Sequence, residues 1–233
     1  LAASVSQRGA LCVGIDPHPG LLRDWGLSVD AAGVEAFARR VVEAVGTEVA
    51  VFKPQSAFFE IHGAAGIAVL ERTLADIAGA GAVSILDVKR GDIGSTMDAY
   101  ADAYLAEGSP LAADAITVSP YLGFGSLQPA FDRAHRYGRG VYVLARTSNP
   151  EGGQVQLALC GDHEGSVAQE IIDAAARLNA ETGQNAVGLV VGPALAALLA
   201  RHSLSLPFHI MSLLPATAFL VLLFTLKPQA LPH

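Results

Sequence analysis

Four ionisable residues lie near the ends of two apolar runs, and their types could support acid–base chemistry. Residues 84–96 read SILDVKRGDIGST and contain Asp87, Lys89 and Asp92. Side chains on a strand alternate between its two faces, so Asp87 and Lys89 are predicted to point to the same side. Lys53 follows another apolar run and could add a second ammonium group. Carboxylates and ammonium groups that alternate in this way keep each other ionised and fix each other's geometry.

A surface salt bridge at a solvated strand end is the alternative explanation, and it would be preferred for an isolated Asp-x-Lys pair. Here the pattern is longer, because Asp92 follows in the same loop and Phe52-Lys53-Pro54 ends a second run. The combination favours a functional site.

The elements that must position these residues are short apolar runs that alternate with helical patterns. This alternation is typical of βα units around a parallel sheet. Polar residues, Gly or Pro follow nearly every run, at the strand edge where such folds place their chemistry. Six strands are predicted, at 11–15, 49–52, 82–86, 115–118, 141–145 and 187–191, with helices at 34–45, 64–80, 96–107 and 167–178.

The size and charge of the chain restrict its class. Its 233 residues, 52% of them hydrophobic, suit one large α/β domain with a sizeable core. The net charge of −7 and the absence of a basic run make nucleic acid an unexpected partner. The two cysteines, Cys12 and Cys160, are far apart, which suits a reducing cytosol.

The segment DVKRGDIGST resembles the signature of orotidine 5'-phosphate decarboxylases, D-x-K-x-x-D-I-x-x-T. The resemblance covers residues 11–192 and is closest to the type 2, or mycobacterial-type, subfamily. The other matching segments occur in the family's order: LCVGIDPHP at 11–19, FKPQSAFFE at 52–60, TVSPYLGFGSL at 117–127 and RTSNPEG at 146–152.

This resemblance implies a (β/α)8 TIM-barrel fold and decarboxylation of orotidine 5'-phosphate to UMP in pyrimidine biosynthesis. It also implies that the reaction uses no cofactor and no metal ion. The expected assembly is a cytoplasmic homodimer whose active sites are shared between subunits.

The resemblance also implies roles for individual residues. Lys89 would protonate C6 of the pyrimidine, and Asp87 would lie beside the substrate carboxylate. Lys53 and Asp92 would complete a Lys-Asp-Lys-Asp array, with Asp92 reaching in from the neighbouring subunit. Ile93 and Thr96 would cross the dimer interface with Asp92.

Two further residues would bind the rest of the substrate. Asp16 would hydrogen-bond the ribose together with Lys53, and Ser148 would contact the amide edge of the pyrimidine.

The composition changes after the sixth predicted strand. All 22 acidic residues lie at or before Glu181, and no glycine follows Gly192. The family's Gly-rich phosphate-binding loops are therefore not expected in residues 193–233, which form a divergent apolar tail after a barrel domain at 1–192. A segment at 208–214 could imitate a seventh strand.

Three explanations of this tail stay open: a mis-ended gene product, a membrane anchor at 210–226, or a substitute for the last barrel units. This uncharged segment is at the short end of the roughly 17–25 residues needed to span a bilayer, and Pro215 interrupts it. The alternative to an active enzyme is therefore an inactive, truncated product that lacks the phosphate site and either associates with a membrane or serves only as a dimer partner. A related sugar-phosphate enzyme is a third hypothesis, against which the TSNPEG and TVSPYLGFG segments argue.

Overall fold

The computed structural model describes residues 1–161, 165–192 and 210–212. The chain divides into two compact units, Leu1–Val141 and Tyr142–His233. The boundary falls within strand β5 (Gly140–Arg146).

The first unit alternates strands with helices. Its elements, in chain order, are α1 (Ala2–Arg8), β1 (Cys12–Ile15), α2 (Pro19–Asp24), α3 (Ala31–Val45), β2 (Val51–Pro54), α4 (Ala57–Glu60), α5 (Gly63–Gly79), β3 (Val83–Arg90), α6 (Gly94–Leu105), β4 (Ala115–Val118), η1 (Phe124–Leu127) and α7 (Gln128–Tyr137).

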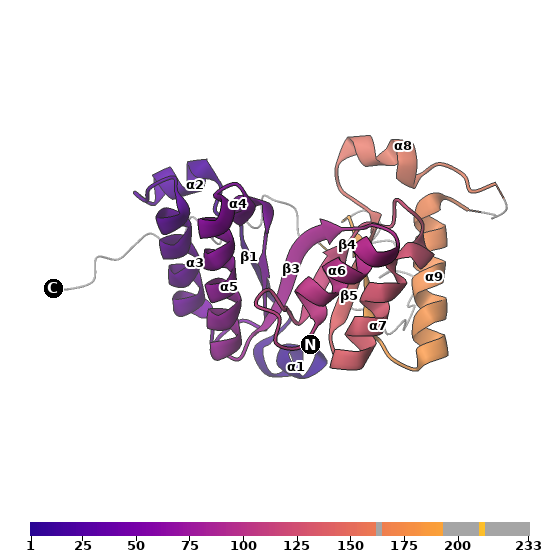
Figure 1. Ribbon diagram of the computed structural model, residues 1–233, viewed down its shortest axis with the longest axis horizontal. Helices are drawn as coiled ribbons and strands as arrows, with labels where there is room; N and C mark the ends of the chain where they lie inside the picture. Colours follow the sequence, from indigo (N-terminus) through magenta and orange to yellow (C-terminus); the bar gives the residue numbers. More distant parts are fainter. Residues whose placement is uncertain (162–164, 193–209, 213–233) are drawn as a thin grey trace. The chain divides into compact units, whose positions relative to one another are not determined.

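The strands of this unit form a parallel sheet in the order β1-β2-β3-β4. Every residue of β2 and β4 is buried, as expected for a parallel sheet covered on both faces. Helices α3 and α5 pack side by side, and so do α6 and α7 (Figure 1). The fully buried core includes Ile15, Phe37, Phe52, Phe59, Leu70, Ile77, Ile85, Leu86, Met97, Leu105 and Ile116.

Local sequence signals set the ends of the helices. Asp30 caps α3, since its carboxylate accepts a hydrogen bond of 2.9 Å from the Gly33 amide. Helix α7 ends at Gly138, whose φ of 65° lies in the left-handed region that glycine adopts without steric cost. These ends fix the lengths of the helices that return the chain to the start of each strand.

The second unit contains the rest of β5, then η2 (Pro150–Gly152), α8 (Gly153–Gln156), α9 (Val167–Thr182), β6 (Val187–Val191) and β7 (Ile210–Ser212). Strand β6 is buried throughout and pairs in parallel with β7, with Val190 opposite Met211. Ser166 caps the start of α9, and Gly183 ends it with a φ of 66°.

The six predicted strands are all present, and β7 lies within the segment that was considered for a seventh strand. The predicted α/β class with a parallel sheet is therefore confirmed. Helix α7 was not predicted, and it buries few side chains, Ala130, Phe131 and Ala134. The helix is mostly polar, but its apolar residues do recur at helical spacing, so the periodic signal was present in the sequence.

Most of the predicted tail, at 193–209 and 213–233, lies outside the described residues. The prediction that the tail lacks Gly-rich phosphate-binding loops falls on those residues as well. Within the ranges that the structure describes, no helix is long and apolar enough to cross a membrane.

Candidate active site

The predicted ionisable residues of the first unit gather at the carboxyl edge of its sheet. Asp16 directly follows β1, Lys53 lies near the end of β2, and Asp87 and Lys89 lie near the end of β3. Strand register places Gly14 opposite Lys53, so the ends of β1 and β2 are level. Parallel strands bring their carboxyl ends to one edge, and this explains why residues far apart in sequence meet here.

Asp87 is the centre of the cluster, since its carboxylate accepts four hydrogen bonds. Oδ2 accepts from Lys53 Nζ at 3.1 Å and from Gln55 Nε2 at 3.0 Å. Oδ1 accepts from Lys89 Nζ and from Thr117 Oγ1, both at 2.7 Å. This buried carboxylate therefore has donors on both oxygens, which fixes its orientation.

The charges in this cluster support one another. Burial by itself would raise the pKa of Asp87, but Lys53 and Lys89 outweigh it, and the pKa lies below its usual value. Burial alone would lower the pKa of Lys53, yet the carboxylates of Asp87 and Asp16 hold it above the usual value. Both partners are therefore ionised at neutral pH.

Asp16 lies in a different environment from Asp87. Its Oδ1 atom is buried without a hydrogen-bond partner among the described residues. Burial raises the pKa of Asp16, although nearby Lys53 opposes this effect. An unpartnered carboxylate oxygen at a strand end is available for a hydroxyl donor from a ligand.

Strand β3 is irregular where it carries the site. Leu86 pairs with Ile116 and Arg90 pairs with Val118, so Asp87, Val88 and Lys89 lie opposite the single residue Thr117. This insertion is a β-bulge, which bends a strand and redirects its side chains. Asp87 and Lys89 do meet, as predicted, but a regular alternation of faces is an incomplete reason for it.

Lys89 has a strained backbone within this bulge. Its φ is 48°, and among the described residues it is the one non-glycine residue with a positive φ. This conformation costs about 1–2 kcal/mol for a residue with a Cβ atom. Such strain persists where surrounding contacts impose it, and it is common at functional sites.

Asp92, Ile93 and Thr96 lie beyond the end of β3. Asp92 accepts a hydrogen bond of 2.8 Å from the Ile93 amide, and it forms no ion pair with any residue in the described ranges. Ile93 is 63% exposed, and Thr96 is exposed as well. The predicted Lys-Asp-Lys part of the array is thus assembled within one chain, whereas Asp92 is not joined to it.

Ser148 belongs to the second unit, in the turn after β5. Gln156 braces this turn: its Oε1 accepts from the Thr147 amide at 2.9 Å, and its Nε2 donates to Thr147 Oγ1 at 2.7 Å. Thr147 Oγ1 in turn donates to Asn149 Oδ1 at 2.6 Å. The residues on either side of Ser148 are therefore held by side-chain hydrogen bonds.

Sequence reasoning missed Gln55 and Thr117, the two uncharged donors to Asp87. A signal for Gln55 was available, because it lies two residues after Lys53 and so on the same face of an extended chain. Thr117 begins the matching segment TVSPYLGFGSL, but the sequence offers no way to align it with Asp87.

The charges of Lys53 and Asp16 influence the pKa of the nearby Cys12 thiol, but this thiol is not a nucleophile. Burial raises the pKa of its thiol to about 11, so the thiol is protonated at neutral pH.

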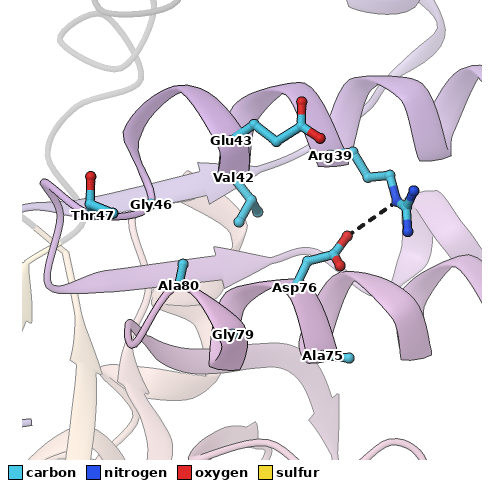
Figure 2. A pocket seen from close by; sticks show the side chains of 9 residues that line it. All are labelled: Arg39, Val42, Glu43, Gly46, Thr47, Ala75, Asp76, Gly79 and Ala80. Carbon is cyan, nitrogen blue, oxygen red and sulfur yellow. Dashed lines mark ion pairs between the residues drawn. The ribbon is translucent and has the colours of Figure 1, made fainter.

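A surface hollow of about 410 Å³ lies between α3 and α5, and none of the site residues line it (Figure 2). Its one ion pair joins Arg39 and Asp76 at 3.2 Å. The hollow is thus separate from the cluster around Asp87.

Comparison with protein families gives one match that spans most of the chain. The model of the "Orotidine 5'-phosphate decarboxylase / HUMPS family" matches residues 9–212. The match extends beyond residue 192, the end of the segment that resembles the family in sequence, and it includes β7.

Curated relatives are similar over most of their length. The chain is 58% identical over 195 residues to an orotidine 5'-phosphate decarboxylase of Nocardioides, covering 82% of this chain and 71% of the relative. It is 54% identical over 195 residues to one of Streptomyces coelicolor, covering 84% and 70% of the two chains.

Solved structures show the same likeness. A structure from Streptomyces avermitilis, assigned to the same enzyme, has a TM-score of 0.84 and 54% identity over 90% of this chain and 73% of that one. The OMP decarboxylase of Leishmania donovani has a TM-score of 0.68 and 35% identity, covering 85% of this chain and 73% of its own.

Proposed function

This chain belongs to the orotidine 5'-phosphate decarboxylase / HUMPS family, and we propose that it converts orotidine 5'-phosphate to UMP and carbon dioxide. The observation that carries the proposal is the carboxylate of Asp87, held between the ammonium groups of Lys53 and Lys89. A sugar-phosphate substrate is disfavoured, since relatives more than half identical to this chain are orotidine 5'-phosphate decarboxylases.

Lys89 is the proposed proton donor. When the bond between C6 and the carboxyl group breaks, the electron pair stays on C6 as carbon dioxide leaves. A fixed ammonium group near C6 stabilises this developing charge and then transfers its proton to the carbon. The Lys89 side chain is 45% exposed, so its ammonium group is accessible to a ligand in this structure.

Asp87 is proposed to act on the substrate carboxylate and on Lys89 together. Its charge would oppose the substrate carboxylate in the ground state and would favour release of carbon dioxide. The same charge holds Lys89 Nζ at 2.7 Å, which keeps the donor in place before the substrate arrives.

The remaining residues are proposed to bind and orient the substrate. The unpartnered Oδ1 of Asp16 would accept a hydrogen bond from a ribose hydroxyl, with Lys53 beside it. Ser148 would contact the amide edge of the pyrimidine, in the turn that Gln156 braces.

We also propose a homodimer in which Asp92, Ile93 and Thr96 complete the site of the neighbouring subunit. The exposed Ile93 side chain and the absence of an ion pair at Asp92 within the described chain support this assignment. A cytoplasmic location belongs to the same proposal, in keeping with two free cysteines.

The test measures turnover of orotidine 5'-phosphate by wild type and by Lys89→Ala. Turnover is monitored as the loss of the substrate's absorbance. Loss of a general acid costs about 10²–10⁴-fold, and we expect a fall in kcat within this range. Arg40→Ala is the matched control, because Arg40 is an exposed cation on α3 and should leave turnover unchanged. Equal turnover in wild type and Lys89→Ala would refute the role of Lys89, and no turnover by wild type would refute the function.

A further inference from the structure

Thr117 of β4 lies opposite the bulge of β3, and its hydroxyl forms hydrogen bonds with both Asp87 and Lys89. The Lys89 amide donates to Thr117 Oγ1 at 3.0 Å, and Thr117 Oγ1 donates to Asp87 Oδ1 at 2.7 Å. Lys89 Nζ then donates to the same Oδ1 atom at 2.7 Å. These three hydrogen bonds close a ring that joins the backbone and the ammonium group of Lys89 through one hydroxyl.

The side chain of Lys89 is not held by packing. It is 45% exposed, whereas Thr117 is only 2% exposed. The direction of the Lys89 side chain therefore depends on its ion pair with Asp87 and on its backbone, whose φ of 48° is not a conformation that lysine prefers. The bond from the Lys89 amide to Thr117 is the side-chain contact that stabilises this conformation directly.

We propose that Thr117 is a positioning residue, whose hydroxyl holds the bulge of β3 so that Lys89 faces the reacting carbon. This inference rests on the proposed function. Thr117 does not itself need to touch the substrate, because it acts through Lys89 and Asp87. The hydroxyl of Thr117 donates its one proton to Asp87, and its oxygen accepts a hydrogen bond from the Lys89 amide. The hydroxyl therefore serves both as a donor and as an acceptor.

The experiment compares Thr117→Val, which keeps the shape and removes the hydroxyl, with Thr117→Ser, which keeps the hydroxyl. A misplaced catalytic group can cost about 100-fold, so we expect kcat of Thr117→Val to fall about 10–100-fold. KM should change little, since no substrate contact is lost. Thr117→Ser should restore most of kcat.

Thr73→Val is the matched control. Thr73 is also 2% exposed, but its hydroxyl donates to the Val69 carbonyl within α5, away from the site. Its kcat should equal that of wild type. A similar fall in Thr73→Val, an unchanged kcat in Thr117→Val, or an equal fall in Thr117→Ser would each overturn the proposal.

A crystal structure of Thr117→Val separates this inference from the proposed function. We expect Lys89 to leave the left-handed region and its Nζ to move away from Asp87, whether or not wild type decarboxylates the substrate. Retention of both features in the variant would overturn the role of Thr117. If Thr117→Val does not fold, Thr117→Cys replaces the hydroxyl with a weaker hydrogen-bonding thiol, and kcat should fall while the fold is kept.

Discussion

At the scale of single residues, Asp87 determines the charge balance of the site. Its side chain is only 9% exposed, and that of Lys53 is 10% exposed. Bringing either charge out of water is unfavourable unless the other is present. The cluster is consequently ionised as a unit, with Gln55 and Thr117 as neutral donors to the same carboxylate.

Replacing Asp87 should therefore destabilise the fold in a pH-dependent way. At neutral pH, we expect Asp87→Asn to lower the free energy of unfolding by about 3 kcal/mol, because Lys53 loses its partner. The pKa of Asp87 is lowered in the folded state, so its contribution is complete above the unfolded value of about 3.9. It is lost as the pH falls through the lower folded-state value.

Urea unfolding of both proteins between pH 7 and pH 3 measures this difference. The gap between wild type and Asp87→Asn should narrow below about pH 4, since wild type then loses the charge as well. Asp132→Asn, an exposed change on α7, should stay within about 0.5 kcal/mol of wild type. If the difference in unfolding free energy between wild type and Asp87→Asn did not vary with pH, the charge of Asp87 would not be the source of this stability.

At the scale of elements, α1 is held to the rest of the first unit by polar contacts. It contains no buried residue. The Arg8 guanidinium donates to the carbonyls of Gly46, Val49 and Ala80 at 3.0, 3.4 and 3.2 Å. Gly46 and Ala80 cap the carboxyl ends of α3 and α5, where a positive charge is favourable.

Arg8→Ala should accordingly lower stability without affecting the chemistry. Hydrogen bonds from a charged donor contribute about 1.5–3 kcal/mol, so we expect a loss of about 2 kcal/mol in the free energy of unfolding. Thermal unfolding measures the loss, and kcat at a temperature where the protein is folded should be unchanged. Arg8→Lys, a single ammonium group, should recover only part of the stability.

At the scale of the whole molecule, the proposed shared site makes a prediction about mixed subunits. Lys89→Ala and Asp92→Ala should each be inactive as homodimers. A hybrid dimer would contain one site with both residues intact, so an equal mixture should regain about a quarter of wild-type turnover if subunits exchange freely.

Sedimentation of wild type should give a mass of about twice the 24.0 kDa of the chain. Mixing Lys89→Ala with a Lys89→Ala, Asp92→Ala double variant is the control, since no hybrid then contains an intact site. Lack of recovery from the first mixture, with hybrid dimers demonstrated, would show that Asp92 serves its own subunit.

The sequence by itself determined the order of strands and the identity of the charged residues. An apolar run that ends at Lys53 or at Asp87 can be recognised from the local sequence alone. Parallel strands then place these charged residues on the same edge of the sheet. The same reasoning missed α7, which is mostly polar and buries only Ala130, Phe131 and Ala134, and it did not include Gln55 in the site.

Only the tertiary structure decided how the site is held. Whether Asp87 and Lys89 follow a regular strand or a bulge depends on pairing with β4, about thirty residues later in the chain. The φ of Lys89 and the two bonds of Thr117 are consequences of that pairing. Local sequence encodes which side chains are available, whereas contacts between distant strands determine which of them share a hydrogen bond.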